Sequence, residues 1–184
     1  MSNGLQAALL LARGRPEARD MLRGSGEALA VARRSFWAAA ICLPAFLCLH
    51  LIDWAQAGPP ARPGHALALD LLGYASGWAG FALVSHHIAA MLGRERQWPQ
   101  FIAAWNWCSL VQYLMLVAAA LPVLLGLPDM VCELVWLVAL GWALWLEWFA
   151  ARVMLDVPTL TAVGFVAFDI AIGMFIAGFT ASLG

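Results

Sequence analysis

The sequence predicts an all-α protein that crosses a membrane five times, and three observations support this prediction. Of the 184 residues, 64% are hydrophobic and only 11% are charged, whereas roughly half of an average soluble chain is apolar and about a quarter is charged. Five apolar segments reach the length of about 20 residues that a helix needs to cross the hydrocarbon of a bilayer. Glycine, proline and charged residues separate these segments and are typical of turns.

The five predicted spans cover residues 36–55, 66–91, 101–125, 131–149 and 159–183, so residues 36–184 are expected to form one five-helix transmembrane bundle. Short connections favour antiparallel neighbours and leave no room for a soluble domain between spans. Residues 1–35 form a separate cytoplasmic segment in which apolar residues are interspersed with arginine. This pattern predicts helices at the membrane interface, and a solvated linker is the alternative.

The positions of arginine predict the orientation, because cytoplasmic loops carry an excess of positive charge. An N-terminus in the cytoplasm places nine arginines on that side and only Arg62 outside; the nine are Arg13, Arg15, Arg19, Arg23, Arg33, Arg34, Arg94, Arg96 and Arg152. Five spans then place the C-terminus in the periplasm. The absence of lysine and the abundance of alanine are associated with GC-rich bacterial genomes, so a bacterial inner membrane is the expected location.

Asp169 is the first candidate functional residue, because an ionisable group inside a span is costly and is often retained for function. At 1.5 Å per residue from Thr159 it lies about 15 Å deep, near the middle of the bilayer. Gly173 and Ala177 share its helical face, and such small residues allow a neighbouring helix to approach closely. We therefore expect Asp169 to face protein, with a polar group within about 3.2 Å.

Further polar residues on or beside spans two to four are predicted to join Asp169 in one intramembrane cluster, and they are His86, His87, Asn106, Gln112, Glu147 and Arg152. Of these, Asn106, Gln112, His86 and His87 are the candidate partners of Asp169. The alternative is that each polar group satisfies a neighbour and only holds the bundle together. A second group, near the outer face, contains His50, Asp53, Asp70 and Glu133. Ordinary solvation at the interface is the preferred explanation of this outer group.

Two sets of residues are predicted to pack helices. Gly73, Gly77 and Gly80 of the second span form one set, and Gly173 and Ala177 of the fifth span form the other. A stripe of tryptophan on the fourth span provides an aromatic surface suited to another membrane subunit.

Cofactor binding is limited to one weak possibility, a haem or pigment held by His86 or His87. His50 lies about 21 Å from the cytoplasmic end of span one and His86 about 10 Å from the same face, so one macrocycle does not fit between them. The sequence contains no catalytic motif, and its four cysteines lack the paired spacing of metal sites. We therefore expect no enzymatic activity, no metal site and no nucleic acid partner.

The layout of a cytoplasmic N-terminal segment followed by five closely spaced spans resembles, in architecture, the Yip1-type membrane proteins. Arg34-Ser35-Phe36-Trp37 leading to Pro44, and Asn106-Trp107 leading to Val111-Gln112, are also similar to uncharacterised small inner-membrane proteins of alphaproteobacteria. Neither resemblance implies an activity.

Two hypotheses about function follow from the residues. The first is a non-enzymatic accessory or organising subunit of a larger membrane complex, because the loops are tiny and the aromatic and small-residue faces suit helix contacts. The second is a small transporter or ion-conducting protein that works through Asp169 and the intramembrane cluster. A pigment- or haem-binding membrane protein is a third, weaker hypothesis.

Overall fold

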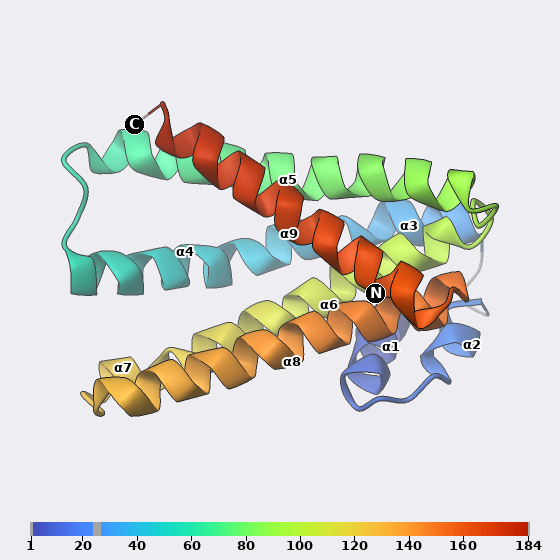
Figure 1. Ribbon diagram of the computed structural model, residues 1–184, viewed down its shortest axis with the longest axis horizontal. Coiled ribbons are helices and arrows are strands. Elements are labelled where there is room, and N and C mark those ends of the chain that lie inside the picture. The colour runs from blue at the N-terminus through green and yellow to red at the C-terminus, as the bar shows by residue number, and fades with distance from the viewer. Residues whose placement is uncertain (1, 24–26, 184) are drawn as a thin grey trace.

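The computed structural model describes residues 2–23 and 27–183 (Figure 1). Its elements are α1 (Ser2–Ala12), α2 (Ala18–Arg23), α3 (Ala28–Ser35), α4 (Trp37–Ala57), α5 (Pro63–Met91), α6 (Trp98–Ala119), α7 (Leu121–Leu124), α8 (Asp129–Leu155) and α9 (Thr159–Ala181). Within the described residues there is no strand. Five helical segments are long and apolar enough to cross a membrane, with α3 and α4 forming the first and α6 and α7 the third. The predicted all-α fold with five spans is confirmed to that extent.

Two helix ends differ from the predicted limits by about six residues, and the other ends differ by three residues or fewer. α6 ends at Ala119 and a short separate helix follows, because Pro122 has no N–H to donate and disturbs a continuing helix. α8 continues to Leu155, whereas the predicted span ends at 149. It extends past Arg152, whose guanidinium lies over the Trp148 ring at 5.5 Å from the ring centroid, and it ends where Asp156 adopts the left-handed conformation.

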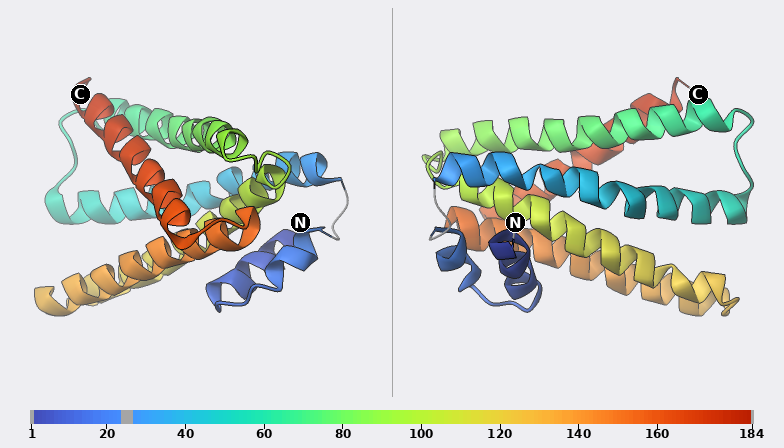
Figure 2. Two further views of the ribbon diagram at one scale, coloured as in Figure 1. Left: turned by 45° about the vertical axis from the view of Figure 1, so that its right-hand side comes forward. Right: turned by 180° about the vertical axis from the view of Figure 1, so that it is seen from behind.

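The helices form a bundle with two distinct ends (Figures 1 and 2). α6 packs along α3, α4 and α8, while α5 packs along α9, which also contacts α8. One end, which we call the arginine-rich end, contains α1, α2 and the loops 92–97 and 156–158. The other, the acidic end, contains the loop 58–62, α7 and the C-terminal end of α9, with Asp53, Asp70, Asp129 and Glu133 nearby.

The tightest packing lies in the half of the bundle near the arginine-rich end. Every residue from Phe101 to Leu110 of α6 is buried. The ring centroid of Phe101 lies 6.1 Å from that of Phe81 on α5 and 5.4 Å from that of Phe165 on α9. These three rings therefore tie α5, α6 and α9 together, whereas Leu114 and Met115, further along α6, are exposed.

The glycines of α5 lie against α9. A Cβ atom added at Gly73 would lie 3.2 Å from Cγ2 of Ile176, and one added at Gly80 would lie 3.5 Å from Cγ2 of Ile172. A larger side chain at Gly73 would therefore push the two helices apart. The structure thus places the Gly-x-x-x-Gly face of the second span inside the chain's own bundle.

The N-terminal helices pack onto the bundle at the arginine-rich end. Ala7, Ala8 and Leu11 of α1 are fully buried, and a Cβ atom at Gly4 would overlap the Trp107 indole of α6. Arg19 of α2 and Arg94 of the α5–α6 loop both lie near the Asp156 carboxylate, with N–O distances of 3.5 and 3.8 Å. Much of the apolar face of these helices is therefore covered by protein.

Candidate functional site

Glu147 of α8 and Asp169 of α9 form a pair of carboxyl groups inside the bundle, which we call the carboxyl pair; Glu147 is buried and Asp169 is half-buried. The two groups lie within hydrogen-bonding reach of each other. Trp105 of α6 donates its indole N–H to Oε1 of Glu147 at 3.0 Å, and the Glu147 residue is only 5% exposed. Three helices thus place two acidic side chains and one N–H donor at one point inside the bundle.

The carboxyl pair lies deep within the apolar part of the chain. Counted along the helices, Glu147 is about 12 Å from the end of α8 at Leu155, and Asp169 is about 15 Å from the start of α9 at Thr159. Two touching carboxyl groups in a medium of low dielectric constant do not both remain charged without compensation. The pair must therefore hold a proton or a cation.

A cavity of about 440 Å³ lies beside the carboxyl pair and is lined by residues of α4, α5, α6, α8 and α9. It extends from Glu147 and Asp169 towards His50, Asp70 and Thr180 near the acidic end. Among the described residues that line it, none is an arginine. The described lining of the cavity therefore offers the carboxyl pair no permanent positive charge.

Aromatic rings form much of the cavity wall, and we call the five of them the aromatic cage: Phe46, Tyr74, Trp78, Trp105 and Tyr113. The centroid of the Tyr74 ring lies 4.6 Å from that of Phe46, 6.0 Å from that of Trp78 and 6.2 Å from that of Tyr113. The Tyr74 hydroxyl donates to the carbonyl of Ala39 at 2.6 Å. This hydrogen bond joins α5 to α4.

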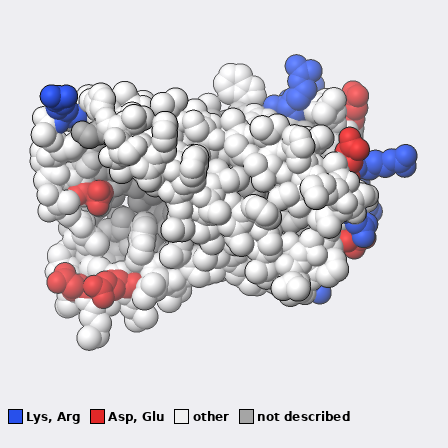
Figure 3. Space-filling model, turned by 45° about the horizontal axis from the view of Figure 1, so that its top comes forward, with Lys and Arg blue, Asp and Glu red and all other residues white. Residues whose placement is uncertain are grey.

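A second cavity, of about 950 Å³, lies nearer the acidic end between α4 and the α6–α8 region. Asp53, Asp129, Glu133 and Trp136 line it, and His50 lines both cavities. At this end of the molecule, acidic side chains lie on two sides of a hollow in the surface (Figure 3). The second cavity therefore leads from the acidic end towards the first one.

The structure places the predicted outer group around these two cavities. His50 Nδ1 lies 3.4 Å from Oδ2 of Asp70, which links α4 to α5. Asp53 and Glu133 lie on opposite sides of the second cavity, on α4 and α8. The four residues of the outer group thus lie in one region. His50 and Asp70 contact each other, whereas Asp53 and Glu133 line the second cavity apart from that pair.

The predicted intramembrane cluster is divided in the structure. Gln112, Glu147 and Asp169 line the first cavity, but Gln112 donates to the carbonyl of Ala143 at 2.8 Å. Asn106 instead donates from Nδ2 to the Ser35 hydroxyl at 2.7 Å. Asn106 therefore ties α6 to α3, and the expectation of a single cluster is corrected.

His86, His87 and Arg152 also lie apart from the carboxyl pair. The His86 ring packs edge-on against Trp98, with centroids 4.8 Å apart, and His87 Nδ1 is 2.8 Å from the carbonyl oxygen of Leu83. None of the cavities described here is lined by either histidine.

The partner of Asp169 is therefore Glu147 and not Asn106, Gln112, His86 or His87. The sequence contained a signal for this pairing, because both acids lie at similar depth from the same ends of adjacent antiparallel spans. The aromatic cage was not anticipated as a site. Its rings come from three spans, and within no single span do they form a pattern that would mark a binding site.

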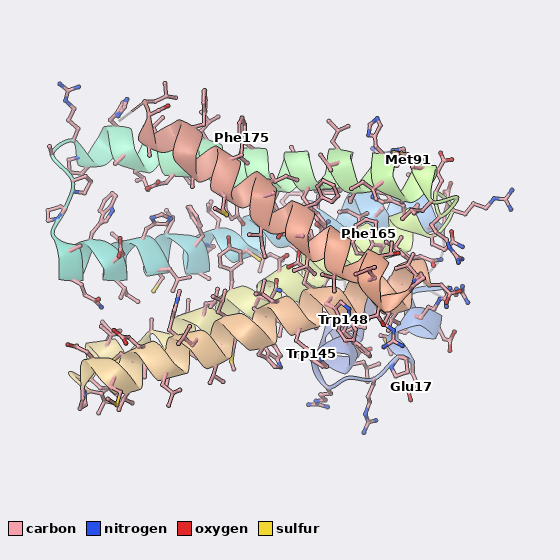
Figure 4. The ribbon with its side chains drawn as sticks, in the orientation of Figure 1. Glu17, Met91, Trp145, Trp148, Phe165 and Phe175 are labelled. Carbon is pink, nitrogen blue, oxygen red and sulfur yellow. The ribbon has the colours of Figure 1, made fainter. Side chains whose placement is uncertain are left out.

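Gly173 and Ala177 line the cavity, and a Cβ atom at Gly173 would meet nothing within 4 Å. No described helix thus packs closely on Gly173. Trp145 stacks on Phe149 at 5.4 Å between centroids, and Figure 4 shows Trp145 and Trp148 beside the N-terminal helices. Part of the tryptophan stripe is therefore already covered within the chain.

Comparison with protein-family models, with curated proteins and with solved structures finds no match to this chain. The architectural resemblance to Yip1-type proteins and the similarity to alphaproteobacterial inner-membrane proteins both stay predictions.

Proposed function

We propose that this chain is a small, non-enzymatic transporter or ion-conducting protein of a bacterial inner membrane, in which the carboxyl pair binds a proton or a cation. One observation supports this proposal above all others. Two neighbouring carboxyl groups lie inside the spans, Asp169 near the middle of α9 and Glu147 nearer the C-terminal end of α8, at the deep end of a cavity whose described lining contains no arginine. Intramembrane carboxyl groups of this kind are costly to bury and commonly mark an ion pathway.

The proposed orientation follows from the arginines, which favour the cytoplasm for the arginine-rich end and the periplasm for the acidic end. Cations would then enter from the periplasmic side. Asp53, Asp129 and Glu133 line the second cavity, and their negative charge raises the local concentration of cations. The packed rings of Phe81, Phe101 and Phe165 form the barrier on the opposite side.

Asp169→Asn is expected to abolish proton- or cation-dependent flux in liposomes, because an amide neither ionises nor releases a proton. Its shape is nearly unchanged, so the fold should persist. Glu95→Gln is the matched control, since Glu95 is exposed in the α5–α6 loop at the arginine-rich end and lines neither cavity. Flux is measured with a pH-sensitive dye inside the vesicles. Parental flux in Asp169→Asn, or no flux in the parent, would contradict the proposal.

An accessory subunit of a larger membrane complex is the second candidate. The observation that favours it is the open space beside Gly141 of α8 and Gly178 of α9, where an added Cβ atom would meet nothing within 4 Å. Such positions allow another transmembrane helix to approach closely. Native mass measurement after purification in mild detergent distinguishes the two proposals, because a subunit should be recovered with its partners and a clean monomer counts against this second candidate.

A further inference from the structure

We propose that the carboxyl pair binds an organic ammonium ion, in exchange for the proton that the pair holds when the cavity is empty. This inference rests on the proposed function and adds to it the chemical class of the substrate. Three features of the first cavity lead to it: its charge, its aromatic wall and its size.

The charge of the site requires a positively charged ligand. Glu147 and Asp169 face the cavity, and the only basic side chain among its described lining residues is His50, which already lies beside Asp70. Trp105 donates to one oxygen of Glu147 and stabilises negative charge there. A carboxylate so deep in the membrane favours a cation beside it.

The aromatic cage selects an organic cation. The face of an aromatic ring attracts an alkylammonium group within about 6 Å of its centroid, and several rings around one point form the known type of cage for quaternary ammonium ligands. Trp78 and Trp105 lie with centroids 5.3 Å apart and nearly perpendicular, and Tyr74 and Tyr113 lie 6.2 Å apart. These rings line the same cavity as the carboxyl pair.

A divalent inorganic cation fits the site less well. Calcium and magnesium require about six oxygen ligands, whereas within the described residues no group of three or more histidine, cysteine, aspartate or glutamate side chains is placed to hold a metal ion. The cavity volume of about 440 Å³ lies within the range of roughly 300–1,000 Å³ typical of small-molecule sites. A compact aryl- or alkylammonium ion therefore matches both the chemistry and the volume.

The proton and the ammonium ion exchange because both bind the same negatively charged site. When the ammonium ion enters, the carboxyl O–H bond breaks and the proton leaves to water in the cavity; no other bond changes. Titratable groups lie around the carboxyl pair on all five helices that line the cavity. They are Cys42 of α4, Tyr74 of α5, Cys108 and Tyr113 of α6, Glu147 of α8 and Asp169 of α9, with His50 and Asp70 nearer the acidic end. Protons and the ammonium ion thus compete for the carboxyl pair, which is the basis of coupled transport in opposite directions.

The test is calorimetric titration of the purified full chain in mild detergent with benzyltrimethylammonium. The matched control ligand is neopentylbenzene, which has the same shape but carbon in place of the charged nitrogen. We expect the ammonium ion to bind, the neutral compound not to bind, and the affinity for the ammonium ion to fall about tenfold per unit decrease in pH while the pair holds one proton. Equal binding of both compounds would overturn the proposal.

Variants of the cage test the aromatic contribution. Tyr113→Leu is expected to weaken binding of the ammonium ion on the order of tenfold. Tyr113→Phe keeps the ring and should keep the parental affinity. This second variant also tests the aromatic contribution if the leucine variant does not fold. Phe175→Leu is the matched control, because Phe175 projects away from the bundle on α9 and is 75% exposed (Figure 4). Unchanged affinity in Tyr113→Leu would show that the aromatic cage does not contribute to binding of the ammonium ion.

Failure of this inference can be distinguished from failure of the proposed function. If the ammonium ion does not bind while Asp169-dependent flux of protons or potassium persists, the substrate class is wrong and the transport proposal stands. If the ammonium ion binds but neither it nor protons cross liposomes, the binding site is supported and the transport proposal is wrong.

Discussion

Replacement of Gly173 by phenylalanine is expected to abolish flux and ligand binding without removing either carboxyl group. Gly173 lines the first cavity one turn beyond Asp169 on α9, and a Cβ atom there would meet nothing within 4 Å. The new ring would extend into the cavity and occupy the space a cation needs. Because the backbone is helical and the space is empty, the fold should tolerate the change. Liposome flux and calorimetric titration measure the loss.

Gly178→Phe is the matched control for this prediction. Gly178 lies on the same helix and a Cβ atom there also meets nothing within 4 Å, but Gly178 does not line the first cavity. Its variant should transport and bind like the parent. Two results would argue against the cavity as the pathway: full activity in Gly173→Phe, or an equal loss in both variants.

The spans were predictable because the cost of burying polar backbone and charge in lipid leaves a strong signal in composition. Each predicted segment contains the middle of an observed helix, and the errors are confined to the ends. At Ala119 the helix stops early because Pro122 follows, and at Arg152 it continues because the guanidinium can lie over Trp148. A long charged side chain near a helix end adjusts its position in this way, so it is a poor marker of where a span ends.

The candidate site was predictable only in part. The depth of Asp169 follows from counting residues. Its partner, however, depends on how far each helix is rotated about its own axis. The sequence does not reveal this rotation when a helix is hydrophobic on all sides. Asn106 illustrates this, because it has a suitable depth yet turns towards Ser35 of α3. The aromatic cage depends on the same rotations in α4, α5 and α6 at once.

Phe101→Ala is expected to have the largest effect on stability, lowering the free energy of unfolding by about 3 kcal/mol. Phe101 is fully buried, and its ring contacts those of Phe81 and Phe165. Truncation leaves a void between α5, α6 and α9, where packing contacts are lost on all sides. Because lipid tails are as apolar as the protein interior, packing of this kind is the main force between membrane helices. The measurement is reversible unfolding in mixed micelles with increasing sodium dodecyl sulfate.

Phe175→Ala separates packing from simple loss of an aromatic ring. Phe175 is 75% exposed on α9, so its removal exposes no void and should change the free energy of unfolding by less than about 1 kcal/mol. A large difference between the two variants means that contacts around Phe101 hold α5 and α9 to α6 at the arginine-rich end. Similar losses in both would show that the contacts around Phe101 are not what holds α5 and α9 to α6.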